Sequence, residues 1–217
     1  MPPAANCALA ESADGQVDGR AMVLLPTVTT DADIVSRVRA GDARGAIALC
    51  ARHYGSPVSR LCFAMFGTQS DAEEATQETF LAAYDGMDSF RGEGSVKSWL
   101  FGIARRVCAR RIEVRARQVR RLALLRNEES TGVGVDVAYE NARRGEQVRD
   151  ALGDLRPTER EAVLLRYVSE LTVREVGEAC GIEEAAARKR IGRALVRLRE
   201  RVIERETSTA KAKAGRT

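Results

Sequence analysis

The fold is decided by residues 71–111, which read DAEEATQETFLAAYDGMDSFRGEGSVKSWLFGIARRVCARR. Residues 71–94 carry seven acidic side chains against one arginine, a net charge of −6. Residues 96–126 carry ten basic side chains against one glutamate, a net charge of +9. Apolar residues recur at spacings of three and four on both sides of a glycine-containing loop, which predicts two adjacent helices. A basic helix suits nucleic acid and an acidic helix suits a basic protein surface, so the pair predicts two different partners.

The acidic helix is predicted to bury one face and expose the other. Asp71 is expected to cap its N-terminus, with Glu74 completing a capping box. The core-facing row is Ala72, Ala75, Thr79 and Ala83, and the outward residues are Glu74, Gln77, Glu78 and Leu81. On the residues alone, this outward face is either an ordinary solvated surface or a docking site for a basic protein.

The basic helix follows a loop that contains Phe90 and Arg91 and is predicted to begin at a Ser95 cap. Its apolar row is Trp99, Leu100, Ile103, Val107 and Ile112. Trp99 is therefore expected in the core rather than on a surface that stacks bases. Arg105, Arg106, Arg110 and Arg111 fall on or near the opposite side.

The C-terminal part of the chain has the pattern of a helix-turn-helix. Capping boxes are predicted at Thr158 with Glu161 and at Thr172 with Glu175. The second box opens a short helix that stops at Gly181, and a long basic helix over about 183–205 follows. The residues expected on the inner face of that long helix are Ala187, Ile191, Leu195, Leu198 and Val202.

Within this pattern, Gly177 is expected where close contact between helices excludes a side chain. The N-terminal part of the long helix would enter the major groove, which places Arg188, Lys189 and Arg193 near base edges or phosphates. The remaining arginines would hold the phosphate backbone. The alternative is a three-helix domain whose basic face is simply solvated.

Composition excludes several classes of protein. The 217 residues carry a formal net charge of +4, and no window approaches the ~20 apolar residues of a membrane span, so no direct membrane insertion is expected. The five cysteines form no CxxC pair, which favours reduced thiols in a cytoplasmic protein. Cys50, His53 and Cys62 lack a convincing fourth metal ligand, so neither a metal nor another cofactor is expected.

The chain resembles an extracytoplasmic-function sigma factor of the bacterial sigma-70 family. The segments that carry the resemblance are DAEEATQETFLAAY, FRGEGSVKSWLFGIARRV and LRPTEREAVLLRYVSELTVREVGEACGI, followed by the basic helix. The resemblance implies an all-α chain of two small helical domains joined by a flexible linker. The implied divisions are a disordered leader at 1–29, sigma region 2 at 30–117, the linker at 118–143, sigma region 4 at 144–206 and a basic disordered tail at 207–217.

The resemblance also implies partners: core RNA polymerase, promoter DNA and an anti-sigma factor. Core polymerase would bind Glu74, Gln77 and Glu78. The −10 promoter element would be held by Phe90, Arg91, Lys97, Arg105, Arg106 and Arg110, with an unstacked base captured by the loop. The −35 element would be read by Arg188, Lys189 and Arg193. Residues 183–187 read EEAAA and lack a capping hydroxyl common in the family, which bears on the −35 sequence preference.

Two other functions compete with this interpretation. A stand-alone helix-turn-helix regulator would explain residues 144–205 but would leave the acidic helix and the loop without a role. An enzyme is disfavoured, because the sequence has no nucleophile–base pair, phosphate-cradling loop or metal cluster. We therefore expect no catalytic site.

Overall fold

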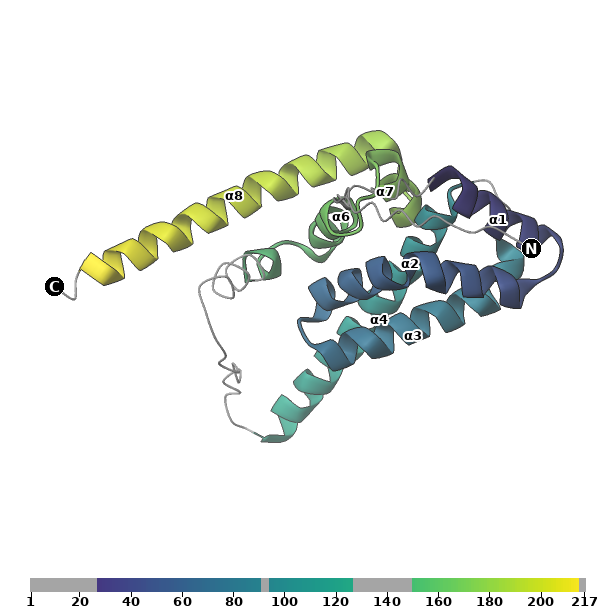
Figure 1. Ribbon diagram of the computed structural model, residues 1–217. Helices are drawn as coiled ribbons and strands as arrows, with labels where there is room; N and C mark the ends of the chain where they lie inside the picture. The colour runs from purple at the N-terminus through teal and green to yellow at the C-terminus, as the bar shows by residue number, and fades with distance from the viewer. Residues whose placement is uncertain (1–26, 91–93, 127–149, 215–217) are drawn as a thin grey trace, which may run out of the picture.

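The structure is a computed structural model that describes residues 27–90, 94–126 and 150–214, and within these ranges it contains helices and no strand. The predicted all-α class is confirmed. Arg91, most of the predicted leader and the greater part of the predicted linker lie outside the described residues. The remainder forms two groups of helices that lie against each other (Figure 1).

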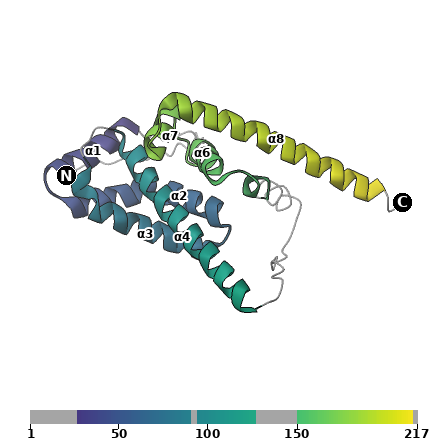
Figure 2. The same cartoon turned by 180° about the vertical axis from the view of Figure 1, so that it is seen from behind.

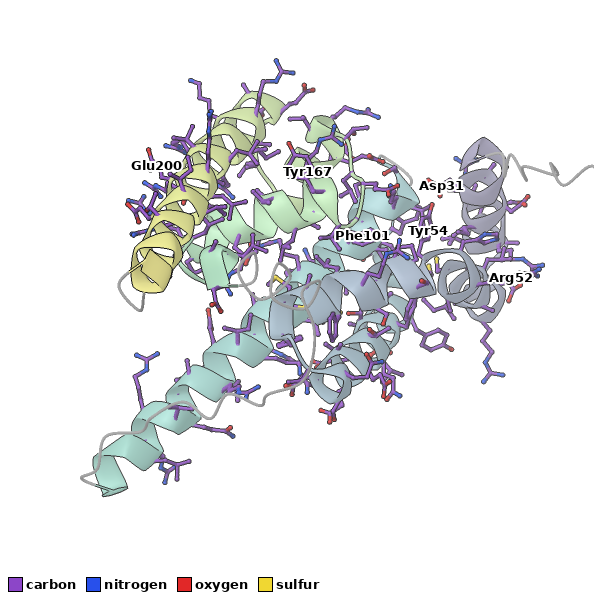
Figure 3. The ribbon with its side chains drawn as sticks, turned by 60° about the vertical axis from the view of Figure 1, so that its left-hand side comes forward. Asp31, Arg52, Tyr54, Phe101, Tyr167 and Glu200 are labelled. Atoms are coloured by element: carbon purple, nitrogen blue, oxygen red, sulfur yellow. The ribbon has the colours of Figure 1, made fainter. Side chains whose placement is uncertain are left out.

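The first group, which we call the first bundle, holds the acidic and basic helices. Its elements are α1 (Thr27–Arg39), α2 (Ala43–Phe66), α3 (Gln69–Asp85), the 3-10 turn η1 (Met87–Ser89) and α4 (Val96–Arg126). Figure 3 shows Tyr54 of α2 pointing toward Asp31 of α1, and its hydroxyl donates to the carboxylate at 2.5 Å. This bond ties the first helix to the second.

The ends of α2 and α3 follow local chemistry. Pro57 lies inside α2, as predicted, and Gly67 ends that helix at φ 78°. Glycine adopts this left-handed conformation without the steric penalty of a Cβ, so the stop is encoded locally. The predicted Asp71 cap of α3 is wrong, because the helix begins earlier at a Thr68 N-cap in extended conformation. The Thr68 side chain accepts from the Asp71 backbone N–H at 3.4 Å and donates to its carboxylate at 2.6 Å.

The second bundle begins with a helical turn at 150–153 and continues through three helices. These are α6 (Pro157–Tyr167), α7 (Val173–Cys180) and α8 (Glu184–Ala214). The predicted capping box at Thr158 is wrong, because Pro157 occupies the first helical turn and Arg156 is the N-cap. Proline's fixed φ and missing N–H suit that position, so the helix starts two residues earlier than predicted. Glu161 is thereby placed in the helix interior, where it is buried.

The helix-turn-helix geometry of α7 and α8 agrees with the pattern in the sequence. Thr172 and Glu175 form the predicted capping box, and Gly181 ends α7 at φ 67°. A Cβ on Gly177 would lie 2.8 Å from the Ile182 carbonyl oxygen, so the turn comes too close for any side chain there. Ala187 and Ile191 are buried as predicted. Leu195 is not, being 37% exposed, and the neighbouring Ala194 takes the inward position.

Two helices run beyond the predicted domain ends. Helix α4 continues to Arg126, past the boundary expected at 117, and Figure 2 shows it extending away from the first bundle. Helix α8 continues to Ala214, into the segment expected as a disordered tail from 207. That segment is rich in alanine and lysine, which favour helix at exposed positions.

The two bundles meet along α4 and α7. A Cβ on Gly102 of α4 would lie 3.2 Å from the Ala179 carbonyl oxygen of α7, so the two backbones approach closely. Phe101, labelled in Figure 3, is fully buried beside this contact. The sequence pattern assigned one buried face to this helix, whereas residues 100–104 are buried without interruption.

Candidate functional site

The predicted acidic face of α3 is paired with the basic helix beside it. Arg111 of α4 bonds to both Glu74 and Glu78, the latter at 3.2 Å, and Arg110 also bonds to Glu78. Arg115 pairs with Asp71 at 3.0 Å. A hydrogen bond from Thr68, reinforced by Arg115, holds the pKa of Asp71 below its ordinary value. We call this set of pairs the α3–α4 ladder.

The outward face of α3 nevertheless keeps docking features. Glu74 and Gln77 are exposed, and Glu78 is half-buried. Leu81 continues the same row and is 66% exposed, and Tyr84, which is also exposed, lies about one turn from Leu81 toward the C-terminus. A large exposed leucine among acidic and polar groups is typical of a protein–protein contact.

The loop between the acidic and basic helices borders a small pocket. Phe90 is 9% exposed and its ring lies 5.1 Å from that of Trp99, tilted by 48°. Ser95 and Ser98 line the same pocket. Trp99 is half-buried and packs against the core, so the sequence expectation that it belongs to the core is met only in part. Glu178 of α7 also lines this pocket, and no spacing pattern in the sequence predicts this contribution from the second bundle.

Two of the predicted −10 residues are engaged by the second bundle. Lys97 donates to the backbone carbonyl of Glu170 at 3.0 Å. Arg105 donates to the Glu161 carboxylate at 3.0 Å and to the Ala179 carbonyl at 3.3 Å. Arg106 is exposed, and Arg110 is exposed but bonded to Glu78. The five of these six candidates that the structure describes therefore do not form one open surface in this arrangement.

The three predicted −35 residues lie on the open side of α8. Arg188, Lys189 and Arg193 are all exposed, and Arg188 pairs with Glu184 one turn earlier at 2.6 Å. A shallow groove along this side is lined by Lys189, Arg193 and Val196. The basic face of α8 is thus accessible, with its apolar face against α6 and α7.

Three of the cysteines, Cys50, Cys62 and Cys108, are buried in the first bundle. The Cys108 thiol contacts that of Cys62 at 3.8 Å between α4 and α2, and both are fully buried. Burial raises the pKa of Cys50 to about 12, which keeps that thiol protonated at neutral pH. His53 is exposed. In the part of the chain that the structure describes, no group of three or more His, Cys, Asp or Glu side chains could hold a metal ion.

Comparison with known families identifies both bundles. Residues 50–118 match the family described as Sigma-70 region 2, and residues 145–198 match that described as Sigma-70, region 4. The chain belongs to the sigma-70 family. Its relatives place it in the extracytoplasmic-function (ECF) group, as the resemblance of the sequence predicted.

Two ECF relatives illustrate the likeness. The chain is 28% identical to the ECF RNA polymerase sigma factor SigE of Mycolicibacterium smegmatis, over 74% of this chain and 63% of the relative. It is 25% identical to the ECF RNA polymerase sigma factor SigW of Bacillus subtilis, over 77% of this chain and 94% of the relative. The alignment thus spans less than two thirds of the first relative and nearly all of the second.

Solved structures share the fold of this sigma-70 family chain. CnrH, solved in complex with the cytosolic domain of CnrY, aligns with a TM-score of 0.57 at 22% identity, covering 79% of this chain and 96% of that one. The sigma factor RpoE of Bartonella quintana, solved with the anti-sigma factor NepR, aligns with a TM-score of 0.54 at 24% identity, covering 67% and 89%. None of the described helices of the present chain is long and apolar enough for a transmembrane segment.

Proposed function

We propose that this ECF sigma factor binds core RNA polymerase, recognises the −10 and −35 elements of a promoter class and so directs transcription initiation. The observation that carries the proposal is that one chain holds separate acidic and basic surfaces on different helices. An acidic, partly apolar face on α3 adjoins a basic α4, and a separate helix-turn-helix exposes a second basic helix. The protein would act in the cytoplasm and catalyse no reaction of its own.

The surface proposed for core polymerase is the outward row of α3. Glu74, Gln77 and Glu78 supply polar and acidic contacts, and Leu81 supplies an exposed apolar side chain at its end. The α3–α4 ladder holds the two glutamates against α4, so their pairing with Arg110 and Arg111 would compete with an incoming basic partner. Leu81 takes no part in these ion pairs, so we expect its exposed side chain to be the main apolar contact with core polymerase.

The surface proposed for the −10 element is the N-terminal half of α4 with the loop before it. Phe90, beside Trp99, would border the space that receives an unstacked base, together with Arg91 of the loop. Lys97, Arg105, Arg106 and Arg110 would hold the strand's phosphates. The −35 element would meet Arg188, Lys189 and Arg193 in the major groove. An anti-sigma factor is proposed as the regulator, since related sigma factors are solved with such partners.

Transcription with purified core polymerase tests the proposal. The chain plus core enzyme is expected to initiate at discrete promoters in genomic DNA of its source, while the chain alone binds the same duplexes poorly. A stand-alone regulator would instead bind specific duplex DNA tightly with no effect of added core enzyme, and that result would refute the sigma-factor assignment.

A substitution on α3 tests the docking surface separately. Leu81→Arg is expected to weaken binding to core polymerase by about tenfold or more, because it replaces an exposed apolar anchor without touching the ladder. Glu73→Arg is the matched control, since Glu73 is an exposed acid on the same helix outside the outward row. Equal binding by both variants would show that this face does not contact the polymerase.

A further inference from the structure

The first turn of the helix proposed to read the −35 element is acidic. Helix α8 opens with Glu184, directly after Glu183, and both residues are exposed. Basic side chains follow one turn later, at Arg188 and Lys189. A carboxylate is repelled by phosphate, so this end of the helix cannot hold the DNA backbone as the later arginines can. Base edges present hydrogen-bond donors as well as acceptors, so they are the part of DNA that a carboxylate can bind.

Glu184 is bonded to Arg188, which lies one turn further along the helix. The Arg188 Nη2 atom donates to Oε1 of Glu184 at 2.6 Å. The side chains of Arg188 and Glu184 are 71% and 45% exposed, so the pair remains open to a ligand. A surface pair at this spacing adds little to the stability of a helix. Its main effect is geometric, because it holds a guanidinium and a carboxylate side by side, each with hydrogen-bonding atoms to spare.

Close packing in the turn before α8 fixes the place of this pair. A Cβ on Gly177 of α7 would lie 3.5 Å from the Glu184 Cα and 2.8 Å from the Ile182 carbonyl oxygen. The first turn of α8 therefore rests directly on α7. Ala187, which lies between the two members of the pair in sequence, is fully buried. The pair is thus anchored to the body of region 4.

The outward face beside the pair carries small side chains. Ala185 and Gly192 are exposed about one turn on either side of Lys189. A Cβ on Gly192 would meet nothing within 4 Å, so this stretch of α8 is open. The major groove of B-DNA admits an α-helix, and small residues on the entering face allow its backbone to approach the base edges. A close approach suits Glu184, because its side chain is shorter than that of arginine or lysine.

From this geometry we propose that Glu184 and Arg188 together select one G·C base pair in the −35 element. In the major groove guanine presents two acceptors, N7 and O6, and its cytosine partner presents the N4 amino donor. Arg188 matches the guanine acceptors and Glu184 matches the cytosine donor, so the bonded side chains complement the two bases of one pair. This inference rests on the proposed function and deepens it, because it assigns a base pair to two residues of the helix.

The same two side chains reject an A·T pair by mismatch. Adenine presents the N6 amino donor where guanine has its O6 acceptor, and thymine presents the O4 acceptor where cytosine has its donor. Arg188 would then face a donor and Glu184 would face an acceptor. Leaving such groups unpaired at the interface discriminates against the wrong base by about tenfold or more.

Two substitutions test the two members of the pair. Glu184→Gln keeps the shape of the side chain but removes its charge, and glutamine favours the N6 and N7 atoms of adenine. Arg188→Lys keeps the charge but loses the fork of donors that matches guanine. Glu200→Gln is the matched control, since Glu200 is an exposed acid on the same helix that borders the basic groove, about 24 Å further along the axis. All three positions are exposed, and circular dichroism verifies that the helices are retained.

The experiment measures base preference with the full chain and core RNA polymerase together. Wild-type holoenzyme first selects duplex fragments from a pool of random sequence, and the selected upstream element is then randomised one position at a time and sequenced after binding. The wild type should favour G·C over A·T by about tenfold or more at one position. Glu184→Gln and Arg188→Lys should each lower that preference by about tenfold at this same position and leave the other positions unchanged. Glu200→Gln should alter the affinity for all fragments alike and retain every preference.

The outcomes separate this inference from the sigma-factor assignment. Wild-type preferences retained in full by Glu184→Gln would overturn the inference, because a carboxylate that only stabilises the helix affects all fragments alike. Changes at two different positions in Glu184→Gln and Arg188→Lys would overturn the reading of a single base pair. In both cases the wild-type holoenzyme still selects promoters, so the proposed function stands. A wild type that selects no DNA with core polymerase would refute the proposed function and this inference with it.

Discussion

Two glycines in the helices of region 4 provide a quantitative test of its packing. Gly177 of α7 and Gly192 of α8 both lie inside helices, yet their surroundings differ. A Cβ on Gly177 would lie 2.8 Å from the Ile182 carbonyl oxygen and 3.5 Å from the Glu184 Cα. A Cβ on Gly192 would meet nothing within 4 Å. The same change to alanine should therefore alter stability in opposite directions.

The magnitudes follow from two opposing effects. Alanine in place of a helical glycine stabilises by about 0.5–1 kcal/mol through lower entropy of the unfolded chain. Gly192→Ala should show this gain alone. At Gly177 the contact is with backbone, which cannot swing away, and overpacking of this kind costs about 1–3 kcal/mol. Gly177→Ala should therefore destabilise the second bundle by about 1–2 kcal/mol net.

Urea denaturation followed by circular dichroism measures both changes in the free energy of unfolding. Since the two bundles need not unfold together, protection of α7 and α8 amides from hydrogen exchange localises the effect to the second bundle. A Gly177→Ala variant as stable as Gly192→Ala would refute the close approach of α7 to the turn, and with it the helix-turn-helix geometry described above.

Three further predictions concern charge and thiols. Arg111→Ala should lower the free energy of unfolding by about 1 kcal/mol in denaturation, because it removes the central, half-exposed member of the α3–α4 ladder. Burial by itself would raise the pKa of Glu175, but hydrogen bonds from Thr172 and Ser95 outweigh it and leave that pKa below its ordinary 4.5. The ionised Glu175 carboxylate therefore stabilises the folded protein above pH 4.5, and this stabilisation is lost as the pH falls through the lower folded pKa. Glu175→Gln should remove this dependence, so the melting temperature of the variant should fall less steeply with acid than that of the wild type. Cys50, Cys62 and Cys108 are buried, so alkylation of the folded protein at neutral pH, followed by mass spectrometry, should leave all three unmodified until denaturant is added.

The sequence predicts the fold where the deciding chemistry is local. Gly67 and Gly181 end their helices with positive φ, and Thr172 and Glu175 form their capping box, as the pattern indicates. The errors have local causes as well. Thr68, not Asp71, is the cap of α3. Thr68 has an acidic residue, Asp71, three positions later, just as the predicted cap Asp71 has Glu74, so the two candidate caps compete.

The candidate surfaces were less predictable, because they depend on side-chain contacts between different helices. Spacing alone places Glu74 and Glu78 outward, and they do lie at the surface, but it cannot show that Arg110 and Arg111 of α4 reach them. Likewise, Ser98, Gly102 and Arg105 form a polar stripe that is typical of a solvated face. Their burial against α7 depends on a contact between residues more than 70 positions apart.

The two buried glutamates of α6 show how region 4 can act as one body. Glu159 and Glu161 are two residues apart, so on a helix their side chains point about 200° apart. One bonds to Arg197 of α8 and the other to Arg105 of α4. Helix α6 is therefore fixed to the proposed −35 reading helix on one side and to the proposed −10 helix on the other. Breaking the Arg105 pair leaves the Arg197 pair intact, so separation at α4 should carry α6, α7 and α8 away together and preserve the helix-turn-helix.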